Sequence, residues 1–337
     1  MKEFILSAAL HDKGITSKDL AAKFRISRQY SQRILHELVQ EGFLVKLGST
    51  RAASYVSPKH AAKVEWKFSK RFTNENLAEH AVMEAVEGRA QFKQSLSENV
   101  RSIFQYAFSE MLNNAIEHSK SKNIQVEVEK RDENLIFIIN DFGIGVFRNV
   151  MQHRHLQSEL EAIQDLLKGK TTTQPQAHSG EGIFFTSKVA DIFTLESFGK
   201  KMIINNLVKD IFIEKATPSK RGTKVSFQIS CESQTHLNDI FRAYQTDPED
   251  YAFDKTEIQI KLYTLGTVHV SRSQARRVLS GLEKFASIIL DFDHVPTIGQ
   301  AFADEIFRVF KNKHPDIQII SKNMNDTVRF WIERVGR

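Results

Sequence analysis

Hydrophobic residues follow helical and strand-like patterns in turn along this chain, with glycine or polar breaks between them. In residues 103–116 the apolar positions recur every three or four residues, which predicts a helix with one buried face. Residues 135–140 are a continuous apolar run of the length of a buried strand. This run ends in Asp-Phe-Gly-Ile-Gly, so we expect the strand to stop at a functional site.

Polar residues interrupt the edge of the predicted helix at a spacing of four. Glu110, Asn114 and His118 should therefore form one column beside the apolar stripe. A carboxylate, a neutral oxygen ligand and an imidazole would then face one ligand. Magnesium keeps most of its waters and needs few protein oxygens beside phosphate groups, which suits a single Asn.

Two further motifs carry the features of a nucleotide site. The carboxylate of Asp141, at a strand end, can accept a hydrogen bond from an exocyclic amine. Gly143 and Gly145 allow a close approach to a flat ring or a positive φ. Gly180–Gly182 precede a helical run that reaches Ala190, so free amides at a helix N-terminus would face phosphate.

The three motifs, SEMLNNAIEHS, INDFGIGV and HSGEGIFF, together resemble those of the Bergerat-fold ATPases in the same order. This superfamily contains gyrase, mismatch-repair ATPases, histidine kinases and anti-sigma-factor serine kinases. The resemblance implies ATP and Mg²⁺ as ligands. Glu110 would position or activate the nucleophile, and Asn114 would bind magnesium. Asp141 would read the adenine, with Gly143 and Gly145 as the glycines of its motif. The other nucleotide-binding candidates are His118, the lid residues Lys170, Thr171, Thr172, His178, Gly180, Glu181 and Gly182, and Thr223 in the GTKVSFQI strand.

The N-terminal segment has the pattern of a small helical module with a hairpin. Residues 2–10 form a first predicted helix, Thr16 and Ser17 cap a second that runs to Phe24, and Ser27 caps a third that runs to Gln40. Residues 43–56, broken at Gly48, indicate a wing hairpin.

The charge of the N-terminal segment indicates what this module binds. Residues 1–70 contain nine Lys and four Arg against two Asp and four Glu, a net +7, whereas the whole chain has +6. A basic module on a near-neutral body favours duplex DNA as a partner. The stretch SRQYSQRILHELVQEGFLVKLG resembles the recognition helix and wing of bacterial winged-helix regulators, and a protein-docking module is the alternative. The resemblance implies a DNA contact surface made of Arg28, Gln29, Tyr30, Gln32, Arg33 and Arg51.

Composition limits the remaining choices. The chain has 337 residues, of which 41% are hydrophobic and 26% charged, as in ordinary globular proteins of two or three domains. No apolar run approaches the length of a membrane span and the N-terminus has no signal pattern, so we expect a cytoplasmic protein that does not enter a membrane. The single cysteine, Cys231, excludes an internal disulfide, and we interpret it as structural.

The C-terminal pattern alternates strands with helices and predicts a small α/β sandwich. The segment ILDFDHVPTIGQAFADEIF resembles the STAS fold of anti-sigma antagonists, which implies a protein partner. Those antagonists carry a phosphorylatable serine where this chain has Gly299, Gln300 and Ala301, and Thr297 is only a near substitute. We interpret Asp304 and Glu305 as a solvated helix face, and a partner surface is the alternative.

The predicted fold is therefore an α/β (α+β) multidomain protein that combines a winged helix, a Bergerat-fold ATPase and a STAS-like sandwich. The expected boundaries are 1–58 for the winged helix, 59–99 for a helical connector, 100–232 for the ATPase, 233–254 for a linker and 255–337 for the STAS-like domain. In the connector, which packs on the ATPase domain or forms a homodimer seam, His80 lacks the phosphoacceptor motif and is interpreted as a packing or capping residue.

These modules favour a transcriptional regulator in which ATP occupancy gates DNA binding and the STAS-like module. A serine/threonine kinase of the anti-sigma type is the main alternative, because Glu110 can act as a base toward a hydroxyl as well as toward water. A sensor histidine kinase is disfavoured by the missing phosphoacceptor motif. Whether the chain is an enzyme stays open at this point.

Overall fold

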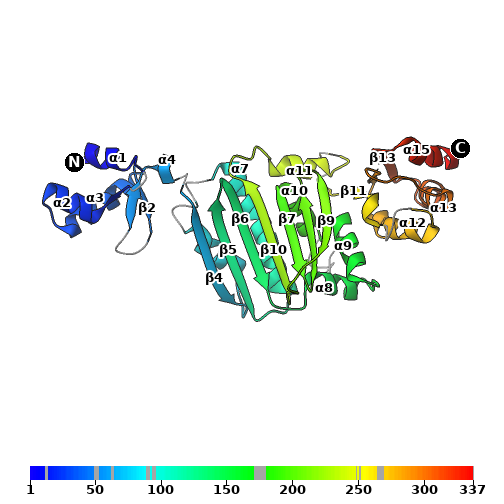
Figure 1. Cartoon of the computed structure of the whole chain (residues 1–337), viewed down its shortest axis with the longest axis horizontal. Coiled ribbons are helices and arrows are strands. Elements are labelled where there is room, and N and C mark those ends of the chain that lie inside the picture. The colour runs from blue at the N-terminus through cyan, green and yellow to red at the C-terminus, as the bar shows by residue number, and fades with distance from the viewer. Residues whose placement is uncertain are drawn as a thin grey trace. The chain divides into compact units, whose positions relative to one another are not determined.

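The computed structural model describes residues 1–11, 14–48, 53–61, 64–88, 92, 96–170, 180–247, 249, 252–263 and 269–336. The chain divides into two compact units. The first comprises Met1–Gly143 and Ala190–Gln234, and the second comprises Ile144–Val189 and Thr235–Arg337. Both units mix helices with strands, which confirms the predicted α/β multidomain class (Figure 1).

The first unit begins with a small module of helices and a three-stranded sheet. Its helices are α1 (Lys2–Ala8), α2 (Ser17–Phe24), α3 (Arg28–Gln40) and α4 (Pro58–Ala61). Strands β1 (Ile15–Thr16), β2 (Val45–Leu47) and β3 (Ser54–Val56) form an antiparallel sheet in the order β1-β3-β2. The predicted caps are confirmed, because the Thr16 side chain accepts from the Asp19 amide and the Ser27 side chain accepts from the Tyr30 amide.

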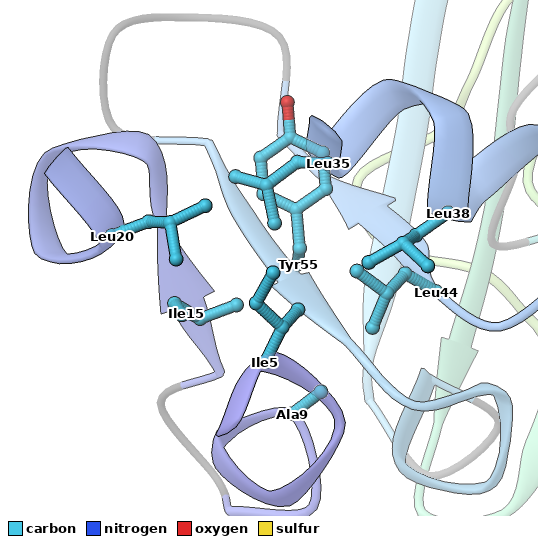
Figure 2. Close-up of a cluster of buried hydrophobic side chains, with 8 residues drawn as sticks. All are labelled: Ile5, Ala9, Ile15, Leu20, Leu35, Leu38, Leu44 and Tyr55. Carbon is cyan, nitrogen blue, oxygen red and sulfur yellow. The ribbon is translucent and has the colours of Figure 1, made fainter. Parts of the chain in front are cut away.

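Apolar side chains from these elements meet in one core (Figure 2). It consists of Ile5, Ala9, Ile15, Leu20, Leu35, Leu38, Leu44 and Tyr55. Helix α3 contributes Leu35 and Leu38, three positions apart, and this spacing leaves its opposite face exposed. Each fully buried Leu or Ile stabilises the fold by roughly 1.5–3 kcal/mol, so the module has a core of its own.

A seven-stranded antiparallel sheet makes up the rest of the first unit, in the order β4-β5-β6-β10-β7-β8-β9 (Figure 1). Helix α7 (Glu98–Asn113) begins at its cap Ser97 and packs Phe104 and Phe108 edge-on against Phe137 of β6. The strands are β4 (Trp66–Thr73), β5 (Asn123–Arg131), β6 (Asn134–Asp141), β7 (Ile192–Ser197), β8 (Lys200–Asn205), β9 (Asp210–Lys215) and β10 (Thr223–Ser230).

The segment expected to be a helical connector instead contributes a strand to this sheet. Strand β4 pairs with β5 along its whole length, from Trp66 opposite Lys130 to Thr73 opposite Asn123. Alternation of Trp66, Phe68 and polar residues is the strand period that the helical interpretation overlooked. A helix does follow, α5 (Glu79–Glu87), but His80 is exposed in its first turn and does not cap it, so the packing or capping interpretation is wrong.

The second unit joins two parts of the chain that are distant in sequence. Helices α8 (Val146–His153), α9 (Glu159–Lys168) and α10 (Gly182–Val189) come from the middle of the chain. Helix α11 (Leu237–Ala243) follows in sequence after β10. The C-terminal part has a parallel sheet in the order β11-β12-β13, formed by β11 (Lys255–Gln259), β12 (Ser287–Asp291) and β13 (Gln318–Lys322).

Helical elements connect these parallel strands. They are η2 (Ile260–Tyr263), α12 (Arg272–Leu279), η3 (Leu282–Lys284), α13 (Gln300–Asp304), the π-helix η4 (Glu305–Phe310), α14 (Lys311–Lys313) and α15 (Asp326–Val335). In the described part of the chain, no helix is both long and apolar enough to cross a bilayer.

An ion-pair cluster corrects one expectation in this part. Asp304 and Glu305 are only 9% and 6% exposed, so they are not a solvated helix face. Arg272 donates to Asp304 over 3.2 Å, and Arg276 donates to Glu305 over 2.8 Å. Both arginines come from α12 and are more than half exposed, so the two carboxylates are covered by ion pairs at the surface.

Candidate nucleotide-binding site

Asp141 and Thr223 lie side by side on the face of the large sheet that α7 covers. Along β6, Asp141 shares this face with Phe137, because side chains two residues apart point the same way. Along β10, Thr223 shares it with Phe227, whose ring stacks on Phe137 with 4.8 Å between the centroids. Strand periodicity thus brings the predicted adenine-reading acid and the predicted pocket threonine together.

The Asp141 carboxylate is buried and held by hydrogen bonds. Burial raises its pKa, and hydrogen bonds from the Gly143 amide and from the amide and hydroxyl of Thr223 oppose that shift. The Gly143 nitrogen donates to Asp141 Oδ1 over 2.9 Å. A buried carboxylate with donors already in place is a suitable acceptor for an exocyclic amine.

The loop after Asp141 is fixed to the end of the long helix. A Cβ atom on Gly143 would lie 1.7 Å from the Ser119 carbonyl oxygen, so only glycine fits there. The Phe142 amide also donates to Ser121 Oγ over 3.0 Å. The two predicted glycines are needed for different reasons. Gly145 has a positive φ of 82° directly before α8, whereas Gly143 allows the backbone to lie against the Ser119 carbonyl oxygen.

The predicted polar column lies at the C-terminal end of α7. Glu110 is in the last turn of α7, and Asn114 and His118 begin and end η1 (Asn114–His118), a π-helix. All three side chains are half-buried. The π-turn bonds residue i to i+5, so the column is less straight than an α-helix would make it, and such turns frequently occur at functional sites.

Lys220 is a residue of this site that the sequence patterns did not indicate. Its Nζ donates to the Asp141 carbonyl oxygen over 2.7 Å and to the Arg221 carbonyl oxygen over 2.9 Å. It also lies 4.9 Å from the centre of the Phe142 ring, and Arg71 lies 5.1 Å from that ring. The sequence offered only the closeness of Lys220 to Gly222 and Thr223. The partner of Lys220, the Asp141 carbonyl oxygen, is 79 residues away, so no local pattern could indicate this contact.

A separate cavity of about 800 Å³ lies on the opposite face of the sheet. Its lining includes Asn140 and Lys224, which are cross-strand partners. Asn140 directly precedes Asp141 and Lys224 directly follows Thr223, so both side chains point away from the face that carries Asp141 and Thr223. This cavity is therefore not the space beside the Asp141 carboxylate, although Lys220, which donates to the Asp141 carbonyl oxygen, contributes to its lining.

A comparison with family models matches residues 99–233 to the family described as histidine kinase-, DNA gyrase B- and HSP90-like ATPase. A second model, described as a STAS-like domain of unknown function (DUF4325), matches residues 274–329. Among the curated proteins, none matches the chain.

Residues 99–233 form an ATPase domain of this type. Such a domain implies ATP binding, usually with Mg²⁺. Asn114 is the residue of the ATPase domain that we predicted as the metal ligand, and a single amide oxygen fits an ion whose other ligands are waters and phosphates. Within the described residues, no group of three His, Cys, Asp or Glu side chains could hold a metal.

The predicted lid residues of the ATPase domain belong to the second unit. Gly180 has a positive φ of 75°, and Gly182 begins α10. Lys170 Nζ donates to the Lys284 carbonyl oxygen over 3.2 Å and lies over the rings of Phe253 and Phe285. Glu181 is half-buried beside the two glycines. Thr171, Thr172 and His178 lie outside the described residues.

The predicted DNA-contacting residues gather on one exposed helix face. Arg28, Gln29, Tyr30, Gln32 and Arg33 all lie on α3 and are exposed. Arg33 forms an ion pair with Glu37 over 3.4 Å, and both side chains are more than half exposed, so the pair adds little stability. Arg51 lies outside the described residues.

Two residues bear on the alternative chemistries. A Cβ atom on Gly299, which caps α13 in the STAS-like domain, would lie 2.9 Å from the Val270 Cα, so a serine does not fit there without backbone movement. Burial raises the pKa of the Cys231 thiol to about 11, which agrees with the structural interpretation of this residue.

Proposed function

We propose that this protein is an ATP-binding, DNA-binding transcriptional regulator in which nucleotide occupancy of the ATPase domain gates the DNA-binding and STAS-like modules. The observation that carries the nucleotide part is the buried Asp141 carboxylate beside Thr223, inside residues matched to the ATPase family. A protein partner on the STAS-like domain, a homodimer and a cytoplasmic location belong to the same proposal.

The proposed roles follow the resemblance and the positions in the structure. Asp141 accepts from the adenine amine, with Thr223 and Gly143 fixing the carboxylate. Asn114 holds magnesium, and Glu110, one α-helical turn earlier, orients the nucleophile. ATP supplies the phosphoryl group, and the lid residues Lys170, Thr171, Thr172, Gly180, Glu181 and Gly182, together with His118, contribute contacts to the nucleotide.

Support for DNA binding comes from the N-terminal module. The order of helices and strands, α1-β1-α2-α3-β2-β3, resembles that of a winged helix, and α3 would then be the recognition helix. Its exposed face carries Arg28, Gln29 and Arg33, the side chains that contact base edges or phosphate, and Tyr30 and Gln32 support them. The net +7 of residues 1–70 would supply the nonspecific attraction.

A calorimetric titration with ATP and Mg²⁺ tests the nucleotide site. The full-length protein should bind, and Asp141→Asn should weaken binding roughly tenfold to a hundredfold, because a hydrogen bond to a charged acceptor is worth about 1.5–3 kcal/mol. Asp132→Asn is the matched control, since Asp132 is an exposed residue of the β5–β6 turn with a side chain 83% exposed. Equal affinity of Asp141→Asn and wild type would overturn the assignment.

A further inference from the structure

The π-helix η1, which carries Asn114, is the end of a long helix, and two side chains cap it. Carbonyl groups in the last turn of a helix have no partner within the helix. Ser119 Oγ donates to the Ala115 carbonyl oxygen over 2.5 Å, and Asn74 Nδ2 donates to the Ile116 carbonyl oxygen over 3.1 Å. The first cap is local, whereas Asn74 reaches the helix end from 42 positions away in the sequence.

The side chain of Asn74 also joins this helix end to the segment that follows it. The same Nδ2 donates to the Ser121 carbonyl oxygen over 3.0 Å, and the Asn74 backbone amide donates to the Lys122 carbonyl oxygen over 2.9 Å. A carbonyl oxygen only accepts, so the amide nitrogen of the side chain must face both carbonyls. Asn74 therefore fixes the path of the chain from Ile116 to Lys122.

The segment held in this way supports the loop that follows the predicted adenine-reading acid. Ser119 and Ser121 are both buried, and Ser119 Oγ accepts from the Ser121 amide over 2.9 Å. Ser121 Oγ in turn accepts from the Phe142 amide over 3.0 Å. Contacts thus run without a gap from the π-helix, through residues 119–122, to the loop after Asp141.

Asn74 comes from a part of the chain that the family match does not include. The match begins at residue 99, whereas Asn74 directly follows β4 at an edge of the large sheet. Strand β4 pairs with β5 up to Thr73, which lies opposite Asn123. This pairing brings Asn74 beside Lys122, and so places its side chain next to the helix end.

We infer that Asn74 is a positioning residue of the nucleotide site, which fixes the turn that carries Asn114 relative to the loop that carries Asp141. This inference rests on the proposed function of the ATPase domain. ATP with Mg²⁺ spans both places, because its metal ion would contact Asn114 and its adenine would contact Asp141. A site of this kind depends on the supporting hydrogen bonds that hold its ligating groups in place. Without Asn74, a nucleotide that meets the adenine loop would meet a displaced metal ligand.

Calorimetric titration of the full-length protein with ATP, once with Mg²⁺ and once with EDTA, tests this role. Wild type should bind more tightly with Mg²⁺. In Asn74→Ala this gain should fall roughly tenfold, the size expected for the loss of one or two hydrogen bonds. The Kd in EDTA should stay close to that of wild type, because the adenine contact remains. Asn74→Asp keeps the size of the side chain but donates to neither carbonyl, and should lose at least as much of the gain.

Asn206→Ala is the matched control. Asn206, in the turn after β8, donates from Nδ2 to the Ala190 carbonyl oxygen over 2.7 Å, so this variant also loses a bond from an asparagine to the backbone. Both of its Kd values should match those of wild type.

Hydrogen exchange of the nucleotide-free protein provides a second measurement. The Ser121 and Phe142 amides should exchange faster in Asn74→Ala than in wild type, while those of β7 and β8 keep their rates. If the gain from Mg²⁺ is the same in wild type and both Asn74 variants, or if ATP binding weakens equally with Mg²⁺ and with EDTA, the positioning role is refuted and the proposed function stands. Wild type that binds no ATP, or gains nothing from Mg²⁺, would instead refute the proposed function of the site, and the inference with it.

Discussion

Two buried ionisable residues, Asp141 and Lys168, are stabilised in opposite ways. Burial drives each toward its neutral form. At Asp141 burial raises the pKa, and amide and hydroxyl donors from Gly143 and Thr223, together with the Lys220 charge, oppose this rise. Lys168 faces carbonyl oxygens that accept from a neutral amine as well as from an ammonium, and its pKa falls to about 8.

This lowered pKa predicts a pH dependence of stability. Between pH 8 and 10.5 the unfolded chain binds a proton at Lys168 that the folded chain does not, so the contribution of Lys168 to stability increases as the pH rises through this range. Relative to Lys168→Met, wild type should gain about 2 kcal/mol between pH 7 and pH 9.5. Asp165, Glu283 and Glu161 favour the charged form and Arg154 disfavours it, and these groups are common to both proteins.

Thermal melting of wild type and Lys168→Met at the two pH values measures this effect as a change in the difference between their melting temperatures. Lys313→Met provides the control, because its difference from wild type should not change with pH. A difference for Lys168→Met that is equally constant would show that Lys168 is charged in the folded protein throughout this range.

Residues whose role depends on local sequence were predicted, and those that depend on distant contacts were not. The place of Asp141 at a strand end follows from the apolar run before it. Lys168 and Lys220 gain their roles from carbonyl groups 109 and 79 residues away, which no local pattern encodes. Whether Glu110, Asn114 and the lid residues bind nucleotide stays a prediction.

At the level of elements, helix ends depend on local sequence and were predicted, whereas strand pairing depends on distant contacts and was not. Thr16 and Ser27 were recognised as caps because a capping side chain bonds an amide three residues away. Strand β4 was overlooked because its pairing with β5 is a long-range contact and its flanks are rich in helix formers. The two compact units were also not foreseen, since residues 144–189 lie inside the matched ATPase range yet pack with the C-terminal part.

Helix α3 is the element on which the DNA proposal can be tested. Arg28→Ala and Arg33→Ala should each weaken duplex DNA binding by the full-length protein, by roughly 1–3 kcal/mol if the side chain reads a guanine edge. A phosphate contact would instead weaken all sequences alike and lower the salt dependence by about one unit of slope. Gel-shift titrations at several salt concentrations distinguish the two outcomes.

Arg131→Ala, at an exposed arginine of the large sheet, is the control for a change in net charge alone. If it weakens binding as much as the α3 variants do, the contact surface is not α3. If wild type does not bind duplex DNA even at low salt, the N-terminal module is a protein dock.

At the scale of the whole molecule, the gating proposal requires that DNA affinity depends on nucleotide. ATP shifts a conformational equilibrium only if it binds one arrangement more tightly than another. Full-length protein should therefore show a different Kd for duplex DNA with and without ATP and Mg²⁺, by about fivefold or more if the coupling is typical. Asp141→Asn should bind DNA with the nucleotide-free affinity in both conditions, and Asp132→Asn should respond as wild type does. A wild-type DNA affinity that ignores saturating ATP would show that the ATPase domain and the N-terminal module act independently, whatever each of them binds.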